Sequence, residues 1–280
     1  VEVLGLEGQA YPGYTLRMFS DSAARVLKEF VFTRPVTLSG GGMFPMGDDM
    51  KLMKGRIRFD ASAGRVRYPL LGTTLDLGRT KGEVLISPQW VVVDKMMGTI
   101  WDGTFTGRVL AQIDDGDALN GSFVLQDMNL TSIGKSYDKK MEKATVHGAI
   151  EFSSKGGNMN SIQAKGEAAL VHGDLVEIPL FGFLGEALSN YIPGLGHLIN
   201  YKISRADCDF SIEKGYVRTS NFAAQGSNMS LEGGGWIRLS DLQVNSDFKL
   251  GLRGFPGFIT SPVFLLAGGL FQLRGTGPLS

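Results

Sequence analysis

The dominant pattern along the chain is an alternation of apolar and polar residues with a period of two. Cys208, Phe210 and Ile212 alternate with polar residues, and so do Phe248, Leu250 and Leu252. Because successive side chains of a strand point to opposite faces of a sheet, this pattern predicts strands with one apolar and one polar face. Further strands are predicted at about 56–60, 66–77, 82–94, 104–114, 119–130, 144–153, 161–171, 215–224 and 229–239.

Turn residues separate these strands, for example at Asp102-Gly103 and Lys214-Gly215. Short turns between regularly spaced strands indicate antiparallel hairpins and not βαβ units. Glycine is frequent, with 39 residues in 280, about twice the usual share of roughly 7%. Two interpretations of the glycines stay open: they permit a strongly curved sheet with close strand approach, or they punctuate ordinary hairpins.

Two segments break the period of two and predict amphipathic helices. In the first, over about 15–30, apolar residues recur at spacings of three and four. In the second, over about 179–192, they form a broad apolar stripe that ends at Pro193-Gly194. The residues of this stripe are Leu180, Phe183, Leu184, Ala187, Leu188 and Tyr191. We therefore expect an all-β, mainly antiparallel structure with two short helices, continuous over 1–280, with a subdivision near 175 as the alternative.

Composition excludes several classes of protein. Lys and Arg together number 28 and balance 28 Asp and Glu, which argues against a non-specific nucleic-acid binder because such proteins need a positive excess. A single cysteine excludes a disulfide framework and a CxxC zinc site. The chain begins at Val1 with neither a start Met nor a signal peptide, so we expect a fragment or a processed chain. Apolar stretches near 178–200 and 254–273 are interrupted by Gly and Pro, and neither predicts a membrane-spanning helix.

No motif in the sequence predicts catalysis. Gly134-Lys135-Ser136 ends like a phosphate-binding loop, but Asn129 stands where that motif requires its first Gly. The Asp residues at 114, 115 and 117 are followed by Leu125 where a calcium loop needs Glu. The chain has three His residues and neither an HExxH nor a GxSxG motif. The sequence therefore predicts a protein that is not an enzyme, with no catalytic residues, no metal site and no cofactor.

The order of the motifs between about Gly82 and Gly254 resembles the carboxy-terminal region of the AsmA-like family, relatives of TamB in the envelope of Gram-negative bacteria. The likeness is carried by Val91-Val92-Val93-Asp94 leading into the Gly-rich segment 98–107, by 119–130, by 165–184, by 206–215 and by 233–237. The earlier step Phe32-Thr33-Arg34-Pro35 fits the family less specifically. Each motif is degenerate, so their order along the chain is the signal.

The resemblance implies a long β-sheet folded into a groove, or β-taco, with an apolar lining. It implies a non-enzymatic periplasmic protein, anchored to the inner membrane by an amino-terminal helix that this sequence lacks. The groove would bind or conduct phospholipid acyl chains between inner and outer membranes in outer-membrane biogenesis. The resemblance brings neither catalytic residues nor a cofactor.

The apolar strand faces supply the candidate lipid-binding residues, which are Phe123, Leu125, Phe210, Ile212, Phe248 and Leu250. The alternative is that these residues fill a closed sandwich core. We expect the helix at 179–192 to cap the sheet, because its polar face has no Lys or Arg for anionic lipid. The alternative function is a scaffold or assembly factor that contacts outer-membrane proteins through exposed sheet edges.

Overall fold

The computed structural model of the chain describes residues 2–12, 30–43, 53–70, 73–112, 118–138, 141, 143–155, 161–172, 203–226, 229–252 and 270–278. The contacts between residues group the chain into two units, which we describe separately. Unit 1 comprises Val1–Met128 and Ala149–Ile162, and unit 2 comprises Asn129–Gly148 and Gln163–Ser280.

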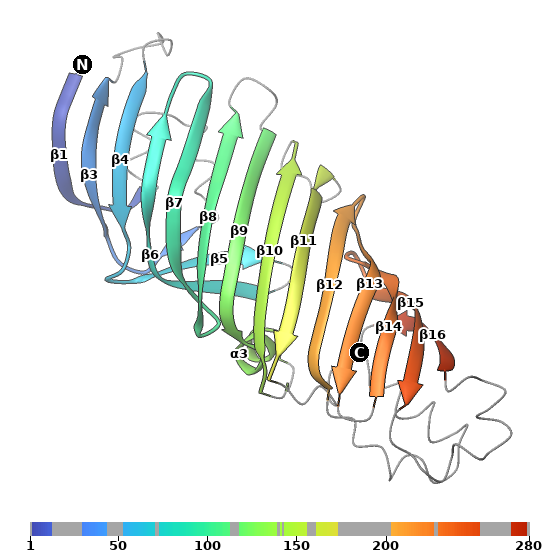
Figure 1. The fold of residues 1–280 in the computed structure, drawn as a ribbon. Coiled ribbons are helices and arrows are strands. Elements are labelled where there is room, and N and C mark those ends of the chain that lie inside the picture. The colour runs from blue at the N-terminus through green and yellow to red at the C-terminus, as the bar shows by residue number, and fades with distance from the viewer. Residues whose placement is uncertain are drawn as a thin grey trace, which may run out of the picture. The chain divides into compact units, whose positions relative to one another are not determined.

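Unit 1 is built from a meander of antiparallel strands (Figure 1). Its strands are β1 (Glu2–Ala10), β2 (Val31–Phe32), β3 (Val36–Met43), β4 (Lys54–Asp60), β5 (Arg65–Leu70), β6 (Thr73–Ile86), β7 (Trp90–Ile100), β8 (Gly103–Gln112), β9 (Ala118–Asn129) and the second part of β10 (Thr145–Ser154). The hydrogen-bonded order is β1-β3-β4-β6-β7-β8-β9, while β2 pairs with β5, and β5 also pairs with β6.

Unit 2 continues the same antiparallel pattern in strict chain order. It contains the first part of β10, then β11 (Gln163–Val171), β12 (Ile203–Glu213), β13 (Tyr216–Gly226), β14 (Met229–Arg238), β15 (Gln243–Leu252) and β16 (Leu270–Pro278). Each terminal strand of the order, β1 in unit 1 and β16 in unit 2, has a single hydrogen-bonded neighbour among the described strands. The predicted all-β antiparallel architecture is therefore confirmed, and the sheet does not close.

The helices differ from the prediction. The predicted helices at about 15–30 and 179–192 lie outside the described residues, except for Phe30, which directly precedes β2 and is not helical. The one helix among the described residues, α3 (Leu130–Ser136), was not predicted. The side chain of Asn129 caps it by accepting a hydrogen bond from the Thr131 backbone N–H at 2.9 Å. Gly134-Lys135-Ser136 forms the end of this helix, whereas a phosphate-binding loop precedes its helix.

Two strand boundaries also correct the prediction. The segment 82–94 is not one strand, because β6 ends at Ile86 and Ser87 turns the chain by a backbone hydrogen bond to the carbonyl of Trp90. Pro88 was the missed signal, since proline cannot donate to a sheet ladder. Likewise, the predicted strand 66–77 is divided between β5 and β6. The glycine-rich β3 and the two terminal strands were not predicted at all.

The two hairpin turns at 101–102 and 214–215 show how the chain reverses. Lys214 and Gly215 both have positive φ between the paired residues Glu213 and Tyr216, which is the backbone of a tight two-residue hairpin turn and confirms the predicted turn. At the other site the turn residues are Trp101 and Asp102, one position earlier than predicted. Gly103 begins β8 instead, where a β-carbon would lie 2.6 Å from the Met128 backbone N.

In unit 1, β2 and β5 cover part of the apolar face of β3 and β4. The core there consists of Val36, Leu38, Ala61 and Val66, with Phe30, Phe32, Ile57, Phe59 and Leu77 packed against it. β6 belongs both to the covering layer and to the layer it covers, because its first half pairs with β5 and its second half pairs with β4. In Figure 1, β5 crosses behind the long strands.

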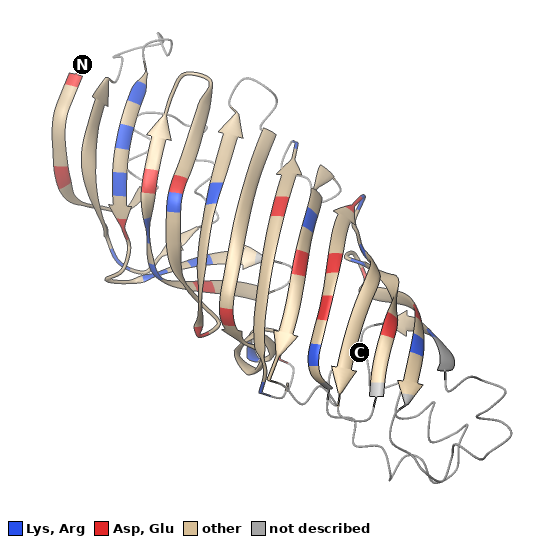
Figure 2. Cartoon of the chain, in the orientation of Figure 1, with Lys and Arg blue, Asp and Glu red and all other residues tan. Residues whose placement is uncertain are grey.

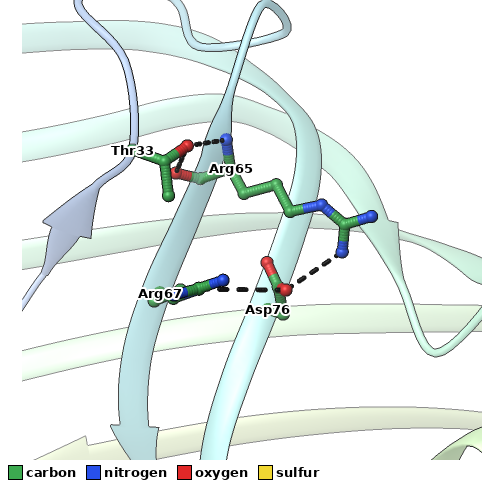
Figure 3. Close-up of polar contacts among 4 residues, drawn as sticks. All are labelled: Thr33, Arg65, Arg67 and Asp76. Carbon is green, nitrogen blue, oxygen red and sulfur yellow. Dashed lines mark hydrogen bonds and ion pairs between the residues drawn. The ribbon is translucent and has the colours of Figure 1, made fainter.

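Polar contacts fasten this covering layer (Figure 3). The Thr33 hydroxyl accepts a hydrogen bond from the Arg65 backbone N–H at 2.8 Å and lies 3.2 Å from the Arg65 carbonyl, to which it can donate. Arg65 Nη1 donates to Asp76 Oδ2 at 3.0 Å, and Arg67 Nε lies 3.9 Å from the same oxygen. These contacts tie the end of β2 to β5, and β5 to β6.

Cross-strand pairs of phenylalanine and glycine recur on the apolar faces of both units. The pairs in direct register are Phe59–Gly82, Phe105–Gly98, Phe123–Gly107, Phe210–Gly166, Phe222–Gly233 and Phe248–Gly233. A β-carbon on Gly98 would lie 2.7 Å from Phe105 Cε1, and one on Gly233 would lie 2.8 Å from Phe248 Cδ1. The rings of Phe59, Phe105, Phe123 and Phe248 therefore lie directly over their paired glycines. Close strand approach explains these glycines better than hairpin punctuation does.

We predict that Gly107→Ala destabilises the fold by about 1–3 kcal/mol, because the added methyl group overlaps the Phe123 ring. Gly8→Ala is the matched control, since a β-carbon there meets nothing within 4 Å. Denaturant unfolding of both variants measures the difference. In a double-mutant cycle with Phe123→Ala, the two effects should be less than additive; full additivity would show that the ring does not require the glycine.

Candidate functional site

The apolar face of unit 2 is the candidate functional site. On β12, the alternating residues Cys208, Phe210 and Ile212 stand opposite Ala168, Gly166 and Ala164 of β11. Directly paired residues of an antiparallel sheet project from the same face. The register therefore places these side chains together, and Asp207, Asp209 and Ser211 on the other face.

The register continues this face through β13, β14 and β15. Ala206 pairs with Ala224, Ala224 with Leu231, and Leu231 with Leu250. Phe248 lies one step further along β15, opposite Gly233. Four of the six predicted residues, Phe210, Ile212, Phe248 and Leu250, thus project from one face of one sheet.

Burial varies strongly across this face. Leu231 and Leu250 are 0% exposed and Phe248 is 4% exposed, whereas Cys208, Phe210 and Ile212 are only half-buried. Phe222 packs edge-on against Phe248, with ring centroids 5.5 Å apart. The β14–β15 part of the face is therefore a packed apolar centre, and the β12 part is the accessible border beside it.

A bulge and three glycines bend the sheet at this place. The register between β13 and β14 shifts between Thr219 and Phe222, which marks a β-bulge. Opposite it, Gly233, Gly234 and Gly235 leave no room for a β-carbon against the carbonyls of the two neighbouring strands. The close approach of three backbones is possible only without side chains at these positions.

The other two predicted residues, Phe123 and Leu125, lie on the apolar face of unit 1. Leu125 pairs with Phe105, and the Phe123 ring lies between those of Phe105 and Phe152. The ring centroids are 6.4 Å apart in the first pair and 6.0 Å in the second, where the rings are parallel. Phe152 in turn lies over Gly121, where a β-carbon would be 2.6 Å from its Cε1. Three adjacent strands thus carry a row of rings, each placed over a glycine of the preceding strand.

The prediction missed several residues of these faces, among them Phe105, Phe152, Phe222 and Leu231. Alternation within each strand indicates their side of the sheet, but it does not say which strands are neighbours. A usable signal was the spacing of Phe and Gly in consecutive segments, because a Phe on one strand faces a Gly on the next. The predicted capping-helix residues Leu180, Phe183, Leu184, Leu188 and Tyr191 lie outside the described residues.

Cys208, the single cysteine of the chain, lies in the accessible border of the unit 2 face. Burial raises the pKa of its thiol, and the neighbouring carboxylates of Asp209 and Asp207 raise it further. The thiol is therefore held neutral beside apolar residues, which suits contact with an apolar ligand and not nucleophilic catalysis.

The chemistry available elsewhere in the described residues is limited. They contain no group of three or more His, Cys, Asp or Glu residues placed to hold a metal ion. They also contain no helix with the length and apolar character needed to cross a membrane.

No protein-family model matches the chain, and no curated protein or solved structure is significantly similar to it. The resemblance to the AsmA-like family therefore stays a prediction that depends on the motif order alone.

We predict that Cys208 reacts slowly with a disulfide reagent such as DTNB at pH 8, and that the rate rises with pH beyond the ordinary range of a thiol. The reason is that only the thiolate reacts, and a raised pKa lowers its fraction at a given pH. Asp209→Asn should lower the pKa and accelerate the reaction, whereas Asp247→Asn, an exchange on β15, should leave it unchanged. A rate equal to that of the urea-unfolded chain at every pH would contradict this account.

Proposed function

We propose that this chain is a non-enzymatic lipid-binding protein whose curved apolar sheet face forms a groove for phospholipid acyl chains. The observation that carries the proposal is the half-buried border of Cys208, Phe210 and Ile212 beside the packed centre at β14–β15. Every described strand of unit 2 belongs to one hydrogen-bonded order. An apolar sheet face normally packs against a second layer, and an acyl chain would serve in its place.

The energetics favour such a ligand. Covering apolar surface contributes about 0.8 kcal/mol per buried CH₂ group, so a chain of ten methylenes in full contact gains several kcal/mol. Rings that lie over glycines present a low surface, with no tall side chain at the glycine positions to obstruct a linear ligand. Because the contacts are apolar and non-directional, we expect binding to depend on chain length more than on headgroup identity.

The setting that we propose follows from the family resemblance. The protein would work in the periplasm, attached to the inner membrane in its full-length form, and would bind or conduct phospholipid between inner and outer membranes. It would need no cofactor, and its ligands would be phospholipid acyl chains. The neutral overall charge and the two-faced strands are compatible with this setting.

One observation favours the scaffold alternative. β1 has β3 as its single hydrogen-bonded neighbour among the described strands, and Leu4 and Leu6 of β1 are exposed. An edge of this kind can pair with a strand of another protein, such as an outer-membrane assembly protein. Lipid uptake by the isolated chain separates the two functions, because a scaffold would not need it.

We predict that the purified chain carries phospholipid, detected by native mass spectrometry after lipid extraction, and that it takes up a fluorescent phospholipid from vesicles. Ile212→Asn should reduce uptake about tenfold or more, because an amide on the apolar face would be covered without a hydrogen-bond partner. Ser211→Asn is the matched control: it introduces the same residue one position away, on the opposite face.

Two outcomes decide the proposal. Lipid-free protein that takes up no fluorescent lipid would refute it and favour the scaffold. Equal loss of uptake in Ile212→Asn and Ser211→Asn would show that the apolar face is not the binding surface, provided that circular dichroism shows both variants folded.

A further inference from the structure

Lys and Arg residues occur on the neighbouring strands β4, β6, β7 and β8 of unit 1 (Figure 2). The register and the ion pairs place their side chains on one face, which we call the polar face. We call this group the basic patch, and it consists of Lys54, Arg56, Arg58, Lys81, Lys95 and Arg108. The register places Arg58 opposite Glu83, Asp60 opposite Lys81, and Glu83 opposite Asp94, so cations and carboxylates of neighbouring strands share this face. All six cations are exposed.

Glu83, the carboxylate at the centre of this group, is buried beneath the cations around it. The Glu83 side chain is 7% exposed, whereas those of Arg56, Arg58 and Lys95 are 65%, 74% and 73% exposed. Glu83 Oε1 lies 3.4 Å from Arg56 Nε and 3.6 Å from Arg58 Nε, and Lys95 Nζ lies 3.9 Å from Oε2. One buried carboxylate thus lies beneath three exposed cations, so the charge that faces solvent around Glu83 is positive.

The other acids of this face leave the patch positive. Asp94 Oδ1 lies 3.7 Å from Arg108 Nε, and Asp60 accepts a hydrogen bond from the Ser62 backbone N–H at 2.8 Å. Six cations therefore face three carboxylates, Glu83, Asp94 and Asp60, between β4 and β8. On the β1 side, Glu2 and Glu7 bound the patch.

Exposed apolar side chains adjoin these cations. Met97 pairs with Lys81 and with Thr106, and Thr106 pairs with Val124. Met97 and Val124 are 41% and 44% exposed on the same face as these cations. This row therefore places two exposed apolar side chains beside a lysine. Exposed apolar side chains that adjoin cations are typical of an interaction surface.

We propose that the basic patch docks unit 1 on the surface of an anionic phospholipid bilayer. Cations near such a surface are attracted by the negative potential of the headgroups, and exposed apolar side chains can enter the interfacial region. A soluble polyanion would use the cations but would gain nothing from Met97 and Val124. The docking uses the polar face and does not depend on acyl-chain binding by the apolar face.

The experiment is flotation of the full chain with vesicles of phosphatidylcholine alone, or of phosphatidylcholine with phosphatidylglycerol, at low and high salt. We expect binding to the anionic vesicles only, weakened by salt. Replacing Lys54, Lys81 and Lys95 by Gln should weaken binding about a hundredfold, since each lysine near the surface contributes roughly a factor of five.

The matched control replaces Lys165, Lys214 and Lys249 of unit 2 by Gln. It changes the net charge of the chain equally and also removes three exposed lysines, but it should leave vesicle binding unchanged. Equal weakening by both triple variants, or equal binding to neutral and anionic vesicles, would overturn the proposal. Failure of lipid uptake alone would not affect it, because flotation does not require the apolar face.

A second variant gives an effect of opposite sign. Glu83→Gln removes the buried negative charge beneath the cations and should tighten binding to anionic vesicles several-fold, whereas a variant that merely disturbed the fold would weaken it. Met97→Ser with Val124→Ser should weaken vesicle binding but not the binding of a soluble polyanion such as heparin. If heparin binds and vesicles do not, the patch recognises a polyanion, and the bilayer assignment is wrong.

Discussion

The cross-strand pairing of phenylalanine with glycine is the constraint on which the apolar faces depend. A phenylalanine opposite any larger residue would have to project from the sheet, whereas opposite glycine its ring can lie against the neighbouring backbone. Four of the six direct pairs, together with the Phe152–Gly121 contact, show this arrangement, and they occur in both units. The ring covers backbone that the glycine leaves bare, which offsets part of the stability that an interior glycine loses.

This pairing also determines what kind of apolar surface each unit presents. The rings in the row Phe105, Phe123 and Phe152 contact one another along the sheet. In unit 2, the Phe248–Gly233 pair lies beside the glycine run 233–235 and a β-bulge, where the backbones of β13, β14 and β15 approach one another closely. The result is an apolar face whose rings lie close to the backbone of the sheet.

The sequence could predict the fold class and the two-faced strands because alternation is a local property. Cys208, Phe210 and Ile212 lie on one face in the structure as their spacing indicated. Local patterns could not reveal which strands pair, and so they missed β5 as a covering strand and the partners of each phenylalanine. They failed again at Gly103, which looked like a turn residue but is required by the close approach of β9.

On the polar face of unit 1, the buried carboxylate of Glu83 and the exposed cations that pair with it differ in their distance from solvent. On unit 1, a carboxylate such as Glu83 is short and buried, while its arginine partners are long and keep their guanidinium groups near solvent. A chain with zero net charge can therefore present a positive surface locally, because exposure and not composition decides which charges a partner meets. Composition alone argued only against a non-specific nucleic-acid binder; the burial of Glu83 beneath three cations is a feature that only the three-dimensional arrangement of the strands reveals.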